Sequence, residues 1–372
     1  MVADGSRQLS MQKKTYNYSA GPAVLPEEVL KEIQTEIFDY QNTGMSVMEI
    51  SHRGKVCIAL FDETEALLRK LMGVSEHYSV LFMQGGARLQ FAAVPLNLFT
   101  KNKKADYIHT GSWTKYAIAE ADKIGEAVVV ASGENDHFRK IPDLSKLKAS
   151  ADADYLYLCT NNTIEGTTIR PEAMPVSVLP IVADMSSNIL SEEYDIEQFG
   201  LIFAGAQKNM GIAGVTIVIV RNDLLERSSK NNADMINYQL MQSKQSMLNT
   251  PPVFAVYVLN KVLKWVEKNG GVRQMAVQNK EKASMLYDFI DNSNLYKNSI
   301  DVDSRSLMNV IFNLPTAEED AQFAKEAGKN GLMFLKGHRD VGGIRASIYN
   351  AAPLAQVQAL IEFMKKYETG RY

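Results

Sequence analysis

Lys208 is the residue of this chain best suited to covalent chemistry. It lies in the segment FAGAQKNMGIAGV (203–215), where an apolar pattern ends in small residues before a glycine-rich turn. A lone lysine is usually a solvated surface residue, because burial of an ammonium group is costly. Small and apolar neighbours such as Ala206 and Met210 would instead desolvate the amine and lower its pKa. The neutral amine is the form that adds to an aldehyde, so we predict an imine-forming lysine.

If the aldehyde belongs to pyridoxal 5′-phosphate, Asp184 is the candidate partner for the ring nitrogen of that cofactor. That cofactor needs an anion beside its ring nitrogen, because a protonated ring is the better electron sink. Asp184 ends the apolar run PIVADM (180–185), and catalytic groups in α/β sheets gather at the carboxyl ends of strands. The competing interpretation is a turn or helix-capping aspartate. The presence of Lys208 favours the cofactor role.

A phosphate site is indicated by Gly85 and Gly86, which stand between an apolar run and a helical pattern that begins near Arg88. Glycines let the backbone approach a phosphate, and a helix N-terminus offers free N–H donors. The turn is not decisive alone, because strand–glycine–helix turns are common. Neither the Walker motif nor the dinucleotide fingerprint occurs. Arg88 could strengthen anion binding.

Two further side chains follow predicted strands. Trp113, in HTGSWTKYAIAEA, could stack on a flat cofactor, although ordinary packing is the alternative. Thr163, in NNTIEG (161–166), could place its hydroxyl near the phenolic oxygen of the cofactor, with a plain turn as the alternative.

Several cationic side chains occur next to glycines. Guanidinium groups bind carboxylates and phosphates in a bidentate manner, so a substrate that carries both groups needs several of them. Glycine neighbours suit loops that close on a ligand. The candidate residues are His52, Arg53, His338, Arg339 and Arg345.

Seven short apolar, β-branched runs predict one sheet. Most are apolar at every position and alternate with helical patterns, as expected for a largely parallel sheet covered on both faces. The class is therefore α/β. The runs are 79–83, 106–110, 127–132, 155–159, 180–185, 201–205 and 215–220.

The pattern changes after the seventh run. A long amphipathic helix is predicted from Pro251 to Gly270, bounded by proline and glycine. A compact α+β unit then follows, with helices at 272–292, 316–329 and 353–367 and strands at 307–314 and 344–350. We predict a flexible leader at 1–14, a large domain at 15–260 and a small domain at 261–372. The first segment of the large domain, about 15–25, is expected to dock on the small one.

The composition is that of a soluble globular protein. The chain has 372 residues, 46% of them hydrophobic, and its 40 basic and 43 acidic residues leave a net charge of −3. This balance gives no support for a nucleic-acid or membrane surface. Cys57 and Cys159 are far apart, which argues against a disulfide framework and against a zinc site. We expect no metal and a cytoplasmic location.

An ordered series of motifs resembles the phosphoserine aminotransferase family, within the class V, fold-type I pyridoxal-phosphate enzymes. The resemblance covers nearly the whole chain. Two departures from the family pattern are Ala20, where some members carry serine, and QGGAR in place of a three-glycine version. The motifs are NYSAGPAVLP, SVMEISHRGK, QGGARLQFAAVPLN, GSWTKYAIAEA, NNTIEG, ADMSSN, AGAQKNMG, NTPPVFAVY and GHRDVGGIRASIYNA.

The resemblance implies a role for each candidate residue. Lys208 would carry the imine, Asp184 would pair with the ring nitrogen and Trp113 would stack on the ring. Thr163 would approach the ring hydroxyl, and Asn249 and Thr250 would reach the cofactor phosphate of a neighbouring subunit, which makes the active unit a homodimer. Residues around the phosphate would be Ala87, Arg88 and Gln207, and residues for the substrate would be His52, Arg53, His338, Arg339 and Arg345.

The activity implied is reversible transamination. Glutamate would donate its amino group to the cofactor, and 3-phosphohydroxypyruvate would accept it to give O-phosphoserine for serine biosynthesis. A pyridoxine-pathway substrate, 4-phosphohydroxythreonine, is also allowed. The alternatives are an alanine:glyoxylate-type aminotransferase, a cysteine desulfurase, and a non-catalytic protein that binds a phosphate ligand.

Overall fold

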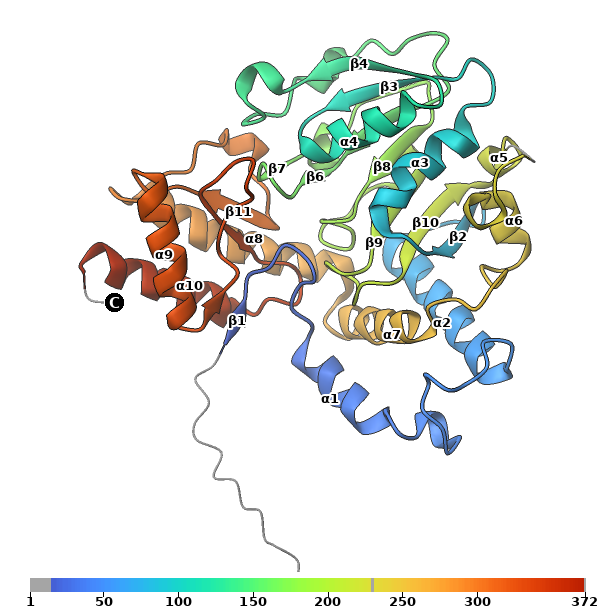
Figure 1. The fold of residues 1–372 in the computed structure, drawn as a ribbon, viewed down its shortest axis with the longest axis horizontal. Helices are drawn as coiled ribbons and strands as arrows, with labels where there is room; N and C mark the ends of the chain where they lie inside the picture. Colours follow the sequence, from blue (N-terminus) through green and yellow to red (C-terminus); the bar gives the residue numbers. More distant parts are fainter. Residues whose placement is uncertain (1–14, 229–230, 371–372) are drawn as a thin grey trace, which may run out of the picture.

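A seven-stranded sheet forms the centre of the molecule, in the computed structural model that describes residues 15–228 and 231–370 (Figure 1). The strand order is β2-β10-β9-β8-β5-β3-β4, and only β10 runs antiparallel to its neighbours. Each of the seven predicted runs forms one strand, so the predicted α/β sheet is confirmed. The leader predicted at 1–14 lies outside the described residues. The strands are β2 (Tyr78–Met83), β3 (Lys104–His109), β4 (Glu126–Ser132), β5 (Leu156–Cys159), β8 (Ile181–Asp184), β9 (Phe199–Gly205) and β10 (Thr216–Arg221).

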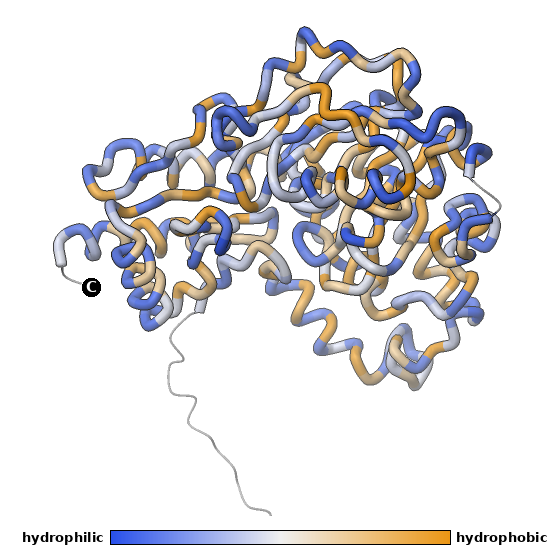
Figure 2. Tube along the Cα trace, turned by 45° about the horizontal axis from the view of Figure 1, so that its top comes forward, coloured by the Kyte–Doolittle hydropathy of each residue, from blue (hydrophilic) through white to orange (hydrophobic). Residues whose placement is uncertain are grey.

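Most of the strands are largely apolar because helices cover both faces of the sheet, while the edge strand β4 is only partly buried. Successive residues of a strand point to opposite faces. In β10, Ile217 and Ile219 pack in one core with α2 (Lys55–Met72) and α7 (Val253–Lys268). Val218 packs in another with α3 (Gly86–Leu98) and α4 (Ser112–Ala121). Hydrophilic stretches gather in the outer loops (Figure 2).

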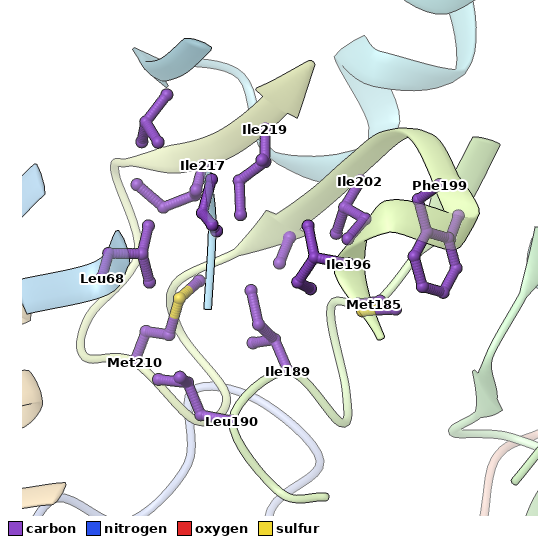
Figure 3. Packing of buried hydrophobic residues seen from close by; sticks show 14 of the residues in the cluster. Leu68, Met185, Ile189, Leu190, Ile196, Phe199, Ile202, Met210, Ile217 and Ile219 are labelled. Atoms are coloured by element: carbon purple, nitrogen blue, oxygen red, sulfur yellow. The ribbon is translucent and has the colours of Figure 1, made fainter. Parts of the chain in front are cut away.

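The first of these cores also anchors the loops that leave β8 and β9. Met185 follows Asp184, and Met210 follows Lys208 by two residues. Both methionines are fully buried in this core, Met210 near Leu190 and Met185 near Ile196 and Phe199 (Figure 3). The backbone on which the two candidate catalytic residues stand is therefore fixed by packing.

The C-terminal part of the chain has a core of its own. It contains Phe312, Phe323 and Tyr296, whose rings meet edge to face. The predicted α+β elements are present, and β1 (Tyr16–Asn17) pairs in parallel with β12. The elements are α8 (Gly271–Asp291), β11 (Asn309–Phe312), α9 (Ala317–Lys329), β12 (Leu332–Met333), β13 (Ile344–Ser347) and α10 (Leu354–Glu368).

Helix α7 is continuous through residue 260, where we predict the boundary between the large and the small domain. The division of the chain into these two domains stays a prediction. None of the helices in the described part of the chain has the length and apolar character needed to cross a bilayer. The remaining helices and strands are α1 (Glu27–Glu36), α5 (Asn222–Leu225), α6 (Tyr238–Ser243), β6 (Asn161–Asn162) and β7 (Thr167–Thr168). Short 3-10 helices lie at Tyr40–Asn42, Glu134–Asp136, Leu144–Lys146, Pro171–Ala173, Ile196–Gln198, Asp234–Ile236 and Val302–Ser304.

Candidate active site

A cavity of about 430 Å³ lies where β2, β5, β8 and β9 end. Carboxyl ends of strands are the usual place for a ligand in an open α/β sheet. A larger cleft, of about 860 Å³, lies beside α1 and contains none of the predicted site residues. Nine of the predicted residues line the smaller cavity: Ala87, Arg88, Trp113, Thr163, Asp184, Gln207, Lys208, His338 and Arg345.

The amine of Lys208 lies close to two members of this set. Its Nζ donates a hydrogen bond to Thr163 Oγ1 over 2.9 Å and lies 5.7 Å from the ring centroid of Trp113. Desolvation lowers the pKa of the Lys208 amine, while the nearby Asp184 carboxylate opposes this shift. The net lowering is the property expected of a lysine that reacts as a neutral amine.

Asp184 is the last residue of β8 and is almost fully buried. Its Oδ1 accepts a hydrogen bond from the backbone N–H of Ser186 at 2.9 Å. Burial raises the pKa of this carboxyl group, against the opposing effects of Ser186 and the Lys208 ammonium. A buried carboxylate is stabilised by a cationic or N–H partner, which a protonated ring nitrogen would supply.

The N-terminus of α3 borders the cavity at Gly85, Gly86, Ala87 and Arg88. Gly85 adopts a left-handed conformation with φ of 88°, and a Cβ built on Gly86 would meet no atom within 4 Å. The first N–H groups of a helix have no intrahelical partners and favour an anion. These donors, the buried Asp184 and the amine of Lys208 together fit pyridoxal 5′-phosphate.

Arg88 and Trp113 are held by aromatic contacts. The Arg88 guanidinium lies 3.9 Å from the ring centroid of Tyr116 and 5.8 Å from that of Trp113. The Trp113 ring is 6.5 Å from that of Phe91. The indole N–H of Trp113 is buried without a hydrogen-bond partner among the described residues. Arg88 therefore borders the cavity as a cation held against two aromatic rings rather than as a free surface side chain.

Two basic side chains from the C-terminal part of the chain also line the cavity. Arg345, on β13, donates from Nη1 to the backbone oxygen of Thr163 over 3.4 Å, and its Nε is buried without a partner among the described residues. Burial lowers the pKa of this guanidinium, and the Glu165 carboxylate opposes that shift. Arg345 and His338 are placed to meet a carboxylate or a phosphate.

The other five predicted residues do not line this cavity in the single chain. Arg339 is adjacent to His338, but its side chain is 87% exposed and lies near Asp340 instead. His52 and Arg53 stand before α2. Asn249 accepts a hydrogen bond from Gln84 over 3.4 Å, and Thr250 is exposed.

Sequence reasoning missed a buried polar network beneath the cavity. Asn161 donates from Nδ2 to Ser187 Oγ and to Asn309 Oδ1, and the Ser306 hydroxyl donates to Asn161 Oδ1. These bonds tie the β6–β7 hairpin to the C-terminal core. The only available signal was the run of polar residues directly after a fully apolar strand.

The two cysteines are buried free thiols in the structure. Burial raises the pKa of Cys57 and of Cys159, so neither is held as the thiolate that a desulfurase nucleophile requires. Cys159 lines the cavity but donates its S–H to the backbone oxygen of Asn161 over 3.4 Å. The geometry disfavours the desulfurase alternative.

Known proteins resemble this chain over nearly its whole length. The family model for aminotransferase class-V matches residues 15–360. A phosphoserine aminotransferase of Bacillus cereus is 49% identical over 356 residues, which cover 96% of this chain and 99% of that protein. One from Listeria innocua is 50% identical over 361 residues, covering 96% and 98%.

Solved structures agree with these sequence matches. A phosphoserine aminotransferase from Bacillus circulans subsp. alkalophilus has a TM-score of 0.94 at 46% identity, covering 97% of this chain and all of that one. A pyridoxal-phosphate-bound phosphoserine aminotransferase from Trichomonas vaginalis has a TM-score of 0.90 at 40% identity, covering 95% and 100%. An alanine–glyoxylate aminotransferase from Nostoc, at 14% identity and a TM-score of 0.73 over 98% and 99% of the two chains, shares the fold alone.

Proposed function

Because the chain belongs to the class-V aminotransferase family, among its phosphoserine aminotransferases, we propose that Lys208 and Asp184 are its catalytic pair. The chain is a pyridoxal-phosphate-dependent aminotransferase. Its reaction is the reversible transfer of the amino group of L-glutamate to 3-phosphohydroxypyruvate, giving O-phospho-L-serine and 2-oxoglutarate. The observation that carries the site assignment is the cavity in which a desolvated lysine, a buried aspartate and the two guanidinium groups of Arg88 and Arg345 meet.

The residues of the chain have separate tasks in this proposal. When bound, pyridoxal 5′-phosphate supplies a ring that accepts electrons from the substrate Cα. Lys208 holds the cofactor and afterwards moves the proton that leaves Cα, because its lowered pKa favours the neutral amine, which can accept that proton. Asp184 holds a proton at the ring nitrogen, and Thr163 keeps the Lys208 amine in place. Trp113 covers the ring and keeps water from it, while Ala87, Arg88 and Gln207 hold the phosphate.

Arg345 is proposed to bind the carboxylate that all substrates of the reaction share, and His338 to contact their distal anionic group. Arg345→Lys keeps the charge but loses the bidentate fork, so we expect KM for O-phosphoserine and for glutamate to rise about tenfold or more. Steady-state kinetics with each donor measure this.

Arg305→Lys is the matched control, because Arg305 makes a bidentate pair with Asp291 at 2.6 and 2.8 Å outside the cavity. It should lower stability and leave KM unchanged. If wild-type protein used serine or alanine as well as O-phosphoserine, the proposed contact between His338 and the substrate phosphate would be wrong.

We propose that the active unit is a homodimer in which His52, Arg53, Asn249 and Thr250 complete the site of the second subunit. None of these residues reaches its own cavity. The segment around Arg53 also exposes large apolar side chains, which typically mark an interface. These are Phe38, Met45, Met48 and Ile58, with 86%, 45%, 56% and 38% of their surfaces exposed.

Met48→Glu should therefore weaken the dimer, because it places a charge in the buried interface. We expect wild-type protein to sediment near twice the chain mass of 41.4 kDa, and the variant to shift toward a single chain and lose activity in parallel. Val178→Glu, at a side chain that is 97% exposed elsewhere, is the control and should change neither. A fully active wild-type monomer would contradict the proposal.

Two finer expectations stay proposals. A cytoplasmic location is supported by the two free thiols, which suit a reducing compartment. The use of 4-phosphohydroxythreonine is supported by its carboxylate and phosphate, the groups that the same cations would bind.

A further inference from the structure

The turn of the β6–β7 hairpin carries a second buried polar side chain besides Thr163, namely Glu165. Its Oε1 accepts two hydrogen bonds from Ser112, one from the backbone N–H and one from the hydroxyl, each 2.7 Å long. The side chain is 5% exposed, and Oε2 is buried without a partner among the described residues. A buried carboxyl group with this arrangement needs a reason to be there.

The N-terminus of α4 explains why the Glu165 carboxyl group is buried at this position. Ser112 is the first residue of that helix and Trp113 the second, while the N-cap residue is Gly111, which has no side chain to cap the helix. Glu165 replaces the missing cap from a distant part of the chain, and its carboxyl oxygen meets the positive end of the helix. A Cβ built on Gly111 would lie 2.5 Å from Glu165 Oε2, so only glycine leaves room for this contact.

We propose that Glu165 is a positioning residue that holds Trp113 over the cofactor ring by capping α4 through Ser112. The same four-residue turn places Thr163 against the Lys208 amine, so one hairpin fixes both the reacting nitrogen and the ring that covers it. This inference rests on the proposed contact between Trp113 and the cofactor.

The test uses Trp113 as its own reporter. The chain has two tryptophans, so a Trp265→Phe background leaves Trp113 as the only one. In that background, and without cofactor, Glu165→Ala should move the emission of Trp113 to longer wavelength and increase its quenching by acrylamide. With cofactor, kcat should fall about tenfold for both O-phosphoserine and glutamate with little change in KM, because the ring contact is common to both half-reactions.

Glu165→Gln should restore all three readouts, since its amide oxygen can still accept both bonds from Ser112. Ser112→Ala, which removes only the hydroxyl bond, should shift them less and in the same direction, and it serves if Glu165→Ala does not fold. Thr316→Ala removes the side-chain cap of α9, where Thr316 accepts from the Glu319 N–H over 3.2 Å. This control should lower stability without changing the emission of Trp113.

An emission of Trp113 that is unchanged in both Glu165→Ala and Ser112→Ala would overturn the role of Glu165. A changed emission with an unchanged kcat would overturn instead the contact between Trp113 and the cofactor. The two failures are therefore distinguishable.

Discussion

Lys208→Ala is expected to lower turnover by about 10⁴-fold or more while the fold is retained, because the side chain that contacts the amine, Thr163, cannot replace it as a base. The hydroxyl of Thr163 is the group that touches Nζ, and a hydroxyl is a poor base at neutral pH. The measurement is kcat for O-phosphoserine and glutamate, together with a thermal unfolding curve. We expect a melting temperature equal to or above that of the wild type, because the variant removes a desolvated amine.

Lys104→Ala is the matched control for this experiment. Lys104 is the first residue of β3, and its largely buried side chain pairs with Asp152 at 2.9 Å. It lies at the amino end of the strand, whereas the cavity lies at the carboxyl ends. It should keep normal turnover. Measurable transamination by a well-folded Lys208→Ala protein would contradict the role of Lys208.

Asp184→Asn is expected to lower kcat by about 10²- to 10³-fold, because an amide cannot keep the ring nitrogen protonated. The substitution is nearly isosteric, and the side-chain oxygen can still accept from the Ser186 N–H. A second consequence concerns Lys208. The Asp184 carboxylate raises the pKa of the Lys208 amine against desolvation, so its removal should lower that pKa further.

The effect of Asp184→Asn on the pKa of Lys208 can be measured separately from its effect on kcat. In protein without cofactor, the reaction of Lys208 with an amine reagent should begin at lower pH in Asp184→Asn than in the wild type. Asp320→Asn is the control, since Asp320 is a buried carboxyl that accepts from the Leu314 N–H over 2.7 Å in the C-terminal core. Normal turnover by Asp184→Asn would remove Asp184 from the catalytic pair.

The seven strands of the sheet were predictable because most of their residues are apolar, on both faces in the central strands, and this pattern is visible in the sequence without knowledge of the packing partners. The direction of each strand could not be predicted from the same pattern. β10 lies between β2 and β9 and runs against both, although its apolar run resembles those of the parallel strands. The glycine-rich turn from 211 to 214 that reverses the chain is visible in the sequence, but a turn alone does not specify which strands it brings together.

The site was predictable where a residue ends a strand, as Asp184 does, because strand ends converge at one edge of a sheet. Glu165 could not be predicted, since glutamates are rarely buried and its partner Ser112 is 53 residues away. His338 and Arg339 show a third limit. They are neighbours in one loop, yet only His338 lines the cavity, because adjacent side chains of a loop can point in different directions.

The proposed covalent bond between Lys208 and the cofactor can be tested by chemical reduction, which fixes the cofactor to the lysine that holds it. Protein purified with pyridoxal 5′-phosphate would be treated with borohydride, digested, and mapped by mass spectrometry for a lysine that carries the reduced cofactor. We expect one modified peptide, which contains Lys208, and no modification in the Lys208→Ala variant. A cofactor fixed to a different lysine, or no fixed cofactor in a protein that still transaminates, would contradict it.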